Sequence, residues 1–125
     1  MKEYSKNDIR NVVLLGATKS GKTTLSEAML FEGKVIDRRG TVEDKNTVSD
    51  NNELEKLNQR SIYATPLYAE FMNKKINIID APGSDDFIGG AVSAFKVCEN
   101  GILVINAQQG VEVGTRGLLR HADKY

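Results

Sequence analysis

Residues 16–23 read Gly-Ala-Thr-Lys-Ser-Gly-Lys-Thr, and this stretch decides how the rest of the chain folds. It fits the pattern G-x-x-x-x-G-K-[ST], which needs a buried strand before it and a helix after it. The apolar run over residues 12–15 is typical of a buried parallel strand. After the stretch, apolar side chains recur at helical spacing, at Leu25, Ala28, Met29 and Leu30. We therefore expect a strand over 12–15 and a helix over 23–31 that ends at Gly33.

The same stretch has the chemistry of the phosphate-binding loop of nucleoside-triphosphatases. Gly16 and Gly21 let the backbone curl so that successive N–H groups point at a phosphate, and the positive end of the following helix adds to the attraction. In this pattern Lys22 reaches the β- and γ-phosphates and the Thr23 hydroxyl binds Mg²⁺. The nucleotide-binding residues predicted in the loop are Ala17, Thr18, Lys19, Ser20, Gly21, Lys22, Thr23 and Thr24.

The overall composition indicates the class of protein. The chain has 125 residues, 40% of them hydrophobic, which suits one domain at most. Lys plus Arg equals Asp plus Glu at 17 each, so no net charge steers the molecule towards nucleic acid or an anionic membrane. The apolar runs are far too short for a membrane span, and residues 1–10 lack the apolar core of a signal peptide. The single cysteine, Cys98, favours a reducing, cytoplasmic setting, and we expect it to be a helix core residue rather than a nucleophile.

The middle of the chain predicts a polar loop followed by a hairpin. Residues 34–60 are crowded with charges and have few large apolar side chains, so we expect a functional loop that is poorly ordered without a γ-phosphate. Residues 61–72 are rich in strand formers, and Pro66 restricts them to an edge strand. A turn at 73–75 leads into a strand over 76–80, and so short a connection predicts an antiparallel hairpin.

The last third of the chain predicts a helix, a strand and a second helix. Residues 87–99 carry apolar side chains at helical spacing, and Asn100-Gly101 is a helix stop signal. Residues 102–105 are typical of a fourth, buried strand, and residues 114–124 of a helix. Strands alternating with helices indicate an α/β fold with a mostly parallel sheet and helices on both faces.

The predicted third strand ends in Asp80-Ala81-Pro82-Gly83, which suggests a second part of the site. An acidic residue at the carboxyl end of an apolar strand is placed to hold Mg²⁺ through water, and Gly83 can bring its N–H close to a γ-phosphate. We therefore predict Thr23 and Asp80 as the metal-binding residues, and Asp80 and Gly83 as nucleotide-binding residues. Taken without the phosphate loop, these residues would also fit an ordinary strand-ending turn.

Several stretches of the sequence carry a family likeness. They are IRNV at 9–12, GKTTL at 21–25 with Glu27 and LF at 30–31, INIIDAPG at 76–83, Phe87, and ADKY at 122–125. These residues resemble the start of the GTP-binding domain of elongation factor G and its relatives, including the tetracycline-resistance ribosomal protection proteins. The resemblance extends over essentially the whole chain.

This resemblance implies a fold and a set of partners. It implies a G-domain fragment of the P-loop NTPase class with strand order 2-3-1-4, in which strand two is antiparallel and the other three are parallel. Switch one would lie at about residues 34–65 and switch two at about 80–90. The cofactors would be GTP or GDP with Mg²⁺, and the partner would be the ribosome, bound through the full-length protein.

The family's guanine-reading motif, N-K-x-D, does not occur in these 125 residues. We therefore expect the chain to be the N-terminal part of the family's GTP-binding domain, and the sequence does not indicate which base it reads. In the family a further strand follows strand four. Without that strand we expect an open, apolar edge and self-association of the chain.

Three residues depart from the family's pattern. Ser84 stands where switch two has the His that positions the attacking water, and Tyr63 stands where switch one has the Thr that binds Mg²⁺. Thr65 or Ser61 would take over from that Thr only with a shifted register. Lys19 replaces an acidic residue of the phosphate loop, where it either adds positive charge near the phosphates or points to water.

These departures lead to a functional prediction with two alternatives. We predict a GTP-binding translation factor whose hydrolysis is slow or absent, because Ser84 is too short to replace an imidazole and Tyr63 removes a metal contact, which leaves the attacking water less ordered. The alternatives are a fully active, ribosome-stimulated GTPase and a fragment that folds but has little nucleotide affinity. The single histidine, His121, is expected to be a surface residue rather than a catalytic one.

Overall fold

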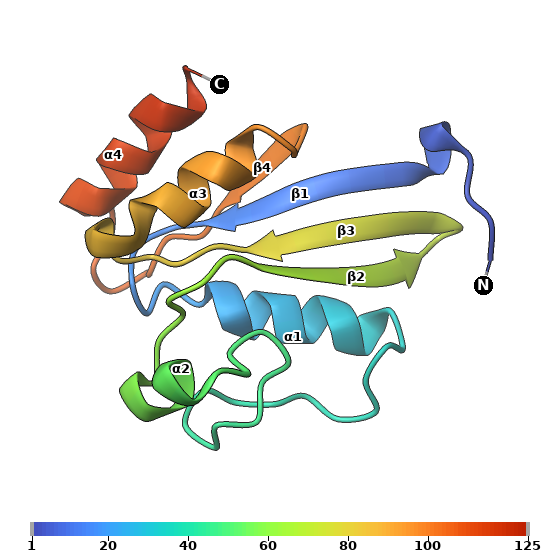
Figure 1. The fold of residues 1–125 in the computed structure, drawn as a ribbon, viewed down its shortest axis with the longest axis horizontal. Coiled ribbons are helices and arrows are strands. Elements are labelled where there is room, and N and C mark those ends of the chain that lie inside the picture. Colours follow the sequence, from blue (N-terminus) through green and yellow to red (C-terminus); the bar gives the residue numbers. More distant parts are fainter. Residues whose placement is uncertain (1, 125) are drawn as a thin grey trace.

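A four-stranded sheet lies at the centre of the molecule in the computed structural model, which describes residues 2–124 (Figure 1). The strands are β1 (Ile9–Leu15), β2 (Thr65–Phe71), β3 (Lys74–Asp80) and β4 (Asn100–Leu103). Their order is β2-β3-β1-β4, with β1 parallel to both β3 and β4 and with β2 antiparallel to β3. The predicted α/β class, strand order and antiparallel edge strand are confirmed.

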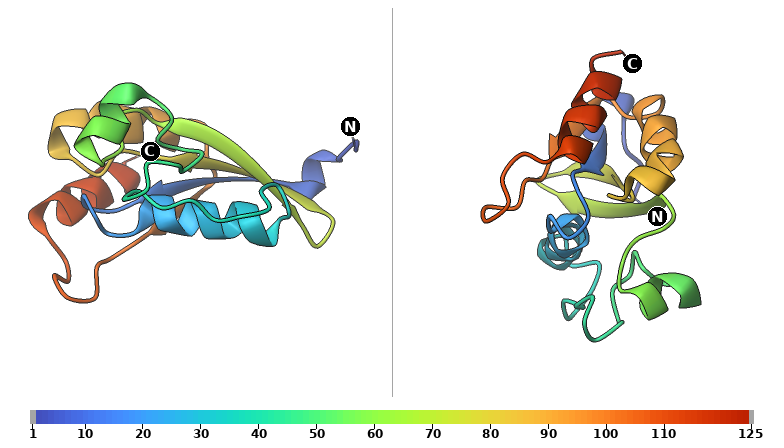
Figure 2. Two further views of the ribbon diagram at one scale, coloured as in Figure 1. Left: turned by 90° about the horizontal axis from the view of Figure 1, so that it is seen from below. Right: turned by 90° about the vertical axis from the view of Figure 1, so that its left-hand side faces the viewer.

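Helices cover both faces of this sheet, as predicted (Figure 2). They are α1 (Lys22–Glu32), α2 (Glu53–Asn58), α3 (Ile88–Phe95) and α4 (Val113–Ala122), with short 3-10 turns at Lys6–Asp8 and Asp85–Phe87. The first helix packs under the sheet, while α3 and α4 lie together on the opposite face (Figures 1 and 2). Over residues 2–124, every helix is too short or too polar to cross a lipid bilayer.

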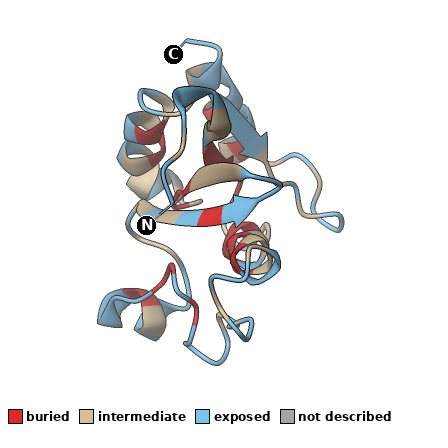
Figure 3. Ribbon diagram, turned by 90° about the vertical axis from the view of Figure 1, so that its right-hand side faces the viewer, coloured by how far each residue is buried: buried red, intermediate tan, exposed pale blue. Residues whose placement is uncertain are grey.

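The central strand β1 contributes to two hydrophobic cores, because alternate side chains of a strand point to opposite faces. Val12 and Leu14 face α1, while Val13 and Leu15 face α3 and α4. The first core is completed by Ala69, Ile78, Leu25, Met29, Leu67 and Ile76, and the second by Ala81, Ala91, Ala94 and Leu118 with their partly buried neighbours. Buried residues gather where the sheet meets the helices (Figure 3). The phosphate loop therefore follows the strand whose side chains pack into both cores.

The inner strands are longer than predicted and the edge strand is shorter. β1 and β3 each begin before the predicted residues 12 and 76, because their first residues pair with one another, Ile9 opposite Lys75 and Arg10 opposite Ile76. Polar residues at the strand ends, such as Arg10 and Lys75, do not belong to an apolar run. β2 begins at Thr65 rather than at 61, since residues 61–64 leave the sheet and turn towards the phosphate loop.

The predictions for the link between α3 and β4 were wrong in detail. The helix is shorter than the predicted 87–99, and Asn100 and Gly101 belong to β4 instead of ending a helix. Their parallel pairing with β1 outweighs the local stop signal. β4 accordingly lies at 100–103 rather than 102–105, and it is not buried as predicted: Ile102 is 37% exposed at the edge of the sheet. The last helix also begins and ends earlier than the predicted 114–124.

Cys98 lies in this same link and not in a helix, contrary to the prediction. Its side chain is partly buried against the core on the α3 side of the sheet. Burial raises the pKa of the Cys98 thiol, and the neighbouring Glu99 carboxylate adds to this effect. A thiol that stays protonated is a poor nucleophile, which supports a packing role.

The long connection over residues 34–64 passes beside α1 and contains a helix that was not predicted, α2 (Figure 1). Asn52 caps this helix by accepting the N–H of Leu54 at 2.9 Å, and the Glu55 carboxylate accepts the N–H of Asn52 at 3.3 Å. This reciprocal pair is a capping box, and its spacing is a signal that the sequence carries. Whether the connection is poorly ordered without a γ-phosphate stays a prediction.

Candidate nucleotide-binding site

The phosphate loop at residues 16–23 leaves β1 through a backbone that suits only glycine at two positions. Gly16 has a φ angle of 145° and Gly21 one of 102°, in the region that other residues rarely adopt. A Cβ at Gly16 would also lie 2.6 Å from the Ser20 Oγ. The loop then passes directly into α1, which begins at Lys22. The N-terminus of α1 therefore faces the same space as the loop amides.

Lys22 is buried at the base of this loop. Its ammonium donates hydrogen bonds to the carbonyl oxygens of Gly16 at 3.0 Å and Ala17 at 2.8 Å. Burial lowers the pKa of Lys22, while the carboxylates of Asp80 and Asp50 act in the opposite direction. Since an ammonium has three N–H donors, the loop leaves one of them for a phosphate oxygen.

Asp80, at the carboxyl end of β3, is fully buried within a group of hydroxyls. Its Oδ2 atom accepts hydrogen bonds from Thr23 at 2.8 Å, from Ser49 at 2.6 Å and from Ser26 at 3.5 Å. Its Oδ1 atom is buried without a hydrogen-bond partner in the part of the chain that the structure describes. Burial raises the pKa of Asp80, opposed chiefly by the hydroxyls of Ser49 and Thr23. A buried carboxylate oxygen without a donor is a position for a cation or a water.

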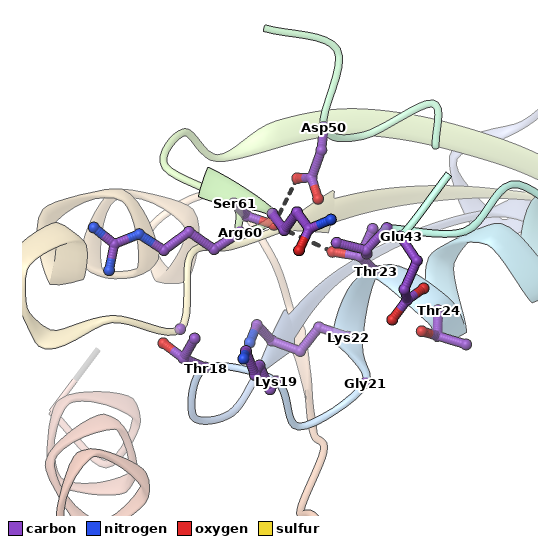
Figure 4. A pocket seen from close by; sticks show the side chains of 13 residues that line it. Thr18, Lys19, Gly21, Lys22, Thr23, Thr24, Glu43, Asp50, Arg60 and Ser61 are labelled. Atoms are coloured by element: carbon purple, nitrogen blue, oxygen red, sulfur yellow. Dashed lines mark hydrogen bonds between the residues drawn. The ribbon is translucent and has the colours of Figure 1, made fainter. Parts of the chain in front are cut away.

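Two further side chains reach this group from the polar connection, as Figure 4 shows. Ser61 Oγ donates to Asp50 Oδ1 at 2.7 Å and lies 3.1 Å from Thr23 Oγ1. Asp50 is only 4% exposed, and its Oδ2 atom also lacks a partner among the described residues. Burial raises the pKa of Asp50, and the Ser61 hydroxyl opposes that change. No pattern in the sequence pointed to Asp50 beyond its place in the polar connection.

A cavity of about 260 Å³ opens in front of the phosphate loop. Of the predicted residues, it is lined by Thr18, Lys19, Gly21, Lys22, Thr23, Thr24 and Gly83. The connection adds residues that the prediction missed: Val42, Glu43, Asp50, Gln59 and Arg60. It also adds Ser61, which the sequence offered only as a substitute for the family's Thr with a shifted register. Ala17 and Asp80 are buried and do not line the cavity, and the buried Ser20 Oγ has no partner among the described residues. Lys19 is exposed and lines the cavity, a position that suits either of its predicted roles.

Of the three departures from the family's pattern, Ser84 and Tyr63 lie outside this lining. The Ser84 hydroxyl donates to Asp86 Oδ2 at 3.4 Å, within its own turn. Tyr63 is 51% exposed. His121 lies on α4 and does not line the cavity either. In this structure, therefore, neither the Ser84 nor the Tyr63 side chain lines the cavity in front of the phosphate loop.

Buried glutamates fasten the connection to the rest of the fold. Glu27 on α1 accepts the N–H of Gly40 at 2.8 Å and that of Val48 at 2.6 Å. Glu55 on α2 accepts the backbone N–H groups of two residues in the stretch 61–64, each at 3.0 Å. Both glutamates are 1% exposed. Glu27 and Glu55 are therefore polar anchors, which the scarcity of large apolar side chains in the connection did not indicate.

The residues present fit a magnesium ion that is bound together with phosphates. Over residues 2–124, no three His, Cys, Asp or Glu side chains gather as they would for a metal site made by protein alone. Mg²⁺ typically takes one or two carboxylates together with substrate phosphates and water. The Thr23 hydroxyl and the unpartnered oxygens of Asp80 and Asp50 supply such ligands beside the phosphate loop.

Comparison with known proteins finds a matching domain family and relatives that include elongation factor G-like and tetracycline resistance proteins. The family described as "Elongation factor Tu GTP binding domain" matches residues 7–125. The "Elongation factor G-like protein" of Mycobacterium tuberculosis is 38% identical over 110 residues, which are 88% of this chain and 15% of that protein. The tetracycline resistance protein TetM of Enterococcus faecalis is 36% identical over 114 residues, 91% of this chain and 18% of that protein.

Solved structures agree with this. A crystal structure of a protein from Thermus thermophilus matches with a TM-score of 0.90 at 34% identity, covering 93% of this chain and 18% of that one. The bacterial selenocysteine-specific elongation factor matches with a TM-score of 0.70 at 27% identity, covering 91% of this chain and 17% of that one. The chain thus spans less than a fifth of the length of these relatives. Because the family match extends over nearly the whole chain, the chain belongs to the elongation factor Tu GTP-binding domain family, with elongation factor G-like and tetracycline resistance proteins among its relatives.

Proposed function

We propose that this chain is the nucleotide-binding part of an elongation-factor-G-like translation factor that acts on the ribosome, in the cytoplasm, in translocation or a related step. It binds GTP or GDP with Mg²⁺, using switch one at about residues 34–65 and switch two at about 80–90. The observation that carries the proposal is the cavity lined by Lys22, Thr23 and Gly83, with the unpartnered Asp80 oxygen behind it. The relatives include proteins named as elongation factors, which supports the same assignment.

Each part of the site has a task in this proposal. The backbone N–H groups of residues 17–24 surround the phosphates, and Lys22 adds positive charge to them. The Thr23 hydroxyl would hold a magnesium ion directly, and Asp80 would hold it through water. When bound, the ion neutralises charge on the phosphates. Gly83 brings the backbone of switch two against the loop, where its N–H would face a γ-phosphate.

Hydrolysis is slow or absent in this proposal, because Ser84 does not orient the attacking water as the family's histidine would. Such a group is typically worth about 10²–10⁴ in rate. The Ser84 side chain is short, and its hydroxyl bonds to Asp86 instead of lining the cavity. Tyr63, the second departure, keeps a half-exposed phenol. Both observations support a factor that binds GTP and does not depend on fast turnover.

The test is phosphate release under single turnover, with and without ribosomes, in the full-length protein that contains this chain. We expect a rate of roughly 10⁻⁴ per second, the scale of an unassisted GTPase. Ser84→His should raise that rate, and Lys22→Ala should remove most of the affinity for GDP. A rate as fast as that of an ordinary elongation factor G would support the active GTPase instead. A protein that binds neither GDP nor GTP would refute the nucleotide site itself.

A further inference from the structure

The switch-one residue that aligns with the family's magnesium ligand is turned away from the site. The Tyr63 N–H donates to Glu55 Oε1 at 3.0 Å, and the N–H of Ile62 donates to the same oxygen at 3.0 Å. The Tyr63 side chain is 51% exposed and lies outside the cavity lining. A buried carboxylate therefore holds this turn so that Tyr63 is kept from the phosphate loop.

Ser61, two residues earlier, takes the place beside the loop instead. It lines the cavity, and its Oγ atom lies 3.1 Å from the Thr23 Oγ1 (Figure 4). Neighbouring ligands of an octahedral magnesium ion, each at 2.0–2.1 Å from the metal, are about 3 Å apart. The two hydroxyl oxygens are thus spaced as adjacent ligands of one ion would be.

Each of these two hydroxyls has a carboxylate to which it can donate its hydrogen. Each hydroxyl has one hydrogen to donate. Thr23 donates to Asp80 Oδ2 at 2.8 Å, and Ser61 donates to Asp50 Oδ1 at 2.7 Å. When both hydrogens are donated to carboxylates, both oxygens keep their lone pairs free at the 3.1 Å contact. In that arrangement the two oxygens can serve as ligands of one cation.

The surrounding carboxylates supply an independent sign of a missing positive charge. Asp50 is 4% exposed and Asp80 is 0% exposed. Each has one buried oxygen with no hydrogen-bond partner in the described part of the chain, Oδ2 of Asp50 and Oδ1 of Asp80. Leaving such atoms buried is costly, so both carboxylates favour a cation at this place.

We propose that Ser61 supplies the switch-one hydroxyl ligand of the magnesium ion, with Asp50 as the residue that positions it. This inference rests on the proposed nucleotide site and changes one part of it: Tyr63 is not a lost metal contact, and Ser84 alone accounts for slow hydrolysis. Thr65, the other hydroxyl near Tyr63, is excluded by its geometry. Its Oγ1 atom donates to the Ser49 carbonyl oxygen at 3.2 Å, and it does not line the cavity.

The experiment measures metal affinity and not turnover. Manganese(II), which takes the place of magnesium and is visible by electron paramagnetic resonance, is titrated into the full-length protein saturated with a non-hydrolysable GTP analogue. Ser61→Ala should raise the dissociation constant for Mn²⁺ about tenfold or more, and Asp50→Asn should raise it by a comparable factor. Ser61→Thr, which keeps the hydroxyl, should restore the affinity.

Two matched controls remove the neighbouring hydroxyls. Tyr63→Phe and Thr65→Val should leave the Mn²⁺ dissociation constant unchanged. The inference is overturned if Ser61→Ala leaves that constant unchanged, or if either control shifts it as much as Ser61→Ala does. A loss of thermal stability in Ser61→Ala with unchanged Mn²⁺ affinity would mean a structural role, which also overturns it. If the unmodified protein binds no GTP analogue, the nucleotide site itself has failed, and this inference with it.

Discussion

Gly83 lies so close to the phosphate loop that a single methyl group does not fit. A Cβ at this position would be 2.6 Å from the carbonyl carbon of Ala17 and would overlap the Lys22 ammonium. We predict that Gly83→Ala lowers the affinity for GDP about tenfold, because the loop or Lys22 must move away from the phosphates. Isothermal titration calorimetry of the full-length protein measures this change.

Gly89 offers a control for that substitution. It lies in α3, and a Cβ there meets nothing within 4 Å. Gly89→Ala should leave the affinity for GDP unchanged and raise the free energy of unfolding by about 0.5–1 kcal/mol, because alanine loses less backbone entropy in a helix. Equal GDP affinities in the Gly83→Ala and Gly89→Ala variants would show that the close approach of Gly83 has no part in binding.

At the scale of elements, α1 holds the polar connection through one carboxylate. Glu27 accepts backbone N–H groups from Gly40 and Val48, and hydrogen bonds to a charged group are worth about 1.5–3 kcal/mol each. Glu27→Gln replaces one acceptor oxygen by an NH₂ group that faces a donor. We predict faster amide hydrogen exchange over residues 40–50, with no change in β1.

The neighbouring Glu32 provides the control on the same helix. Its ion pair with Arg39 joins two half-exposed side chains at 3.2 Å, and such pairs contribute little to stability. Glu32→Gln should therefore leave exchange over residues 40–50 as it is. If Glu27→Gln behaves in the same way, the connection is held by something other than this carboxylate.

At the scale of the whole molecule, β4 is the exposed edge of the sheet. It pairs only with β1 among the described strands, and its side chain at Ile102 is 37% exposed. Unpaired strand edges bind other strands, so we predict that the 125-residue chain self-associates as its concentration rises. Light scattering after size-exclusion chromatography measures the mass. Ile102→Lys should reduce the association, because a charge on an edge strand opposes pairing.

Val113 is the matched control for this edge. It lies on α4, is 84% exposed and is also apolar. Val113→Lys adds the same charge away from the edge, so it should not change the association. A strictly monomeric mass of the unmodified chain at high concentration would contradict the prediction.

The sequence alone predicted those features that depend on near neighbours. The strand of Val12–Leu15, the glycine loop and α1 follow from apolar spacing and from the conformations that glycine allows within a few residues. Pro66 and the short turn after β2 likewise predicted an antiparallel edge strand. The ends of α3 and β4 could not be found in this way, since Asn100 and Gly101 pair with a strand far away in the sequence.

The sequence by itself determined the phosphate loop, because its glycines and Lys22 are one continuous stretch. Only the tertiary structure decided which residues surround that loop. Ser61 lies 38 positions from Thr23 in sequence and Ser49 lies 31 from Asp80, yet hydrogen-bond contacts join both pairs. A buried polar group needs a hydrogen-bond partner, and the fold decides which residues lie close enough to supply one. Glu27 and Glu55 are buried and have such partners, although no hydropathy pattern indicates their burial. The nearness of Ser61 to Thr23, and the distance of Tyr63 from the cavity, are therefore consequences of packing and not of position in the chain.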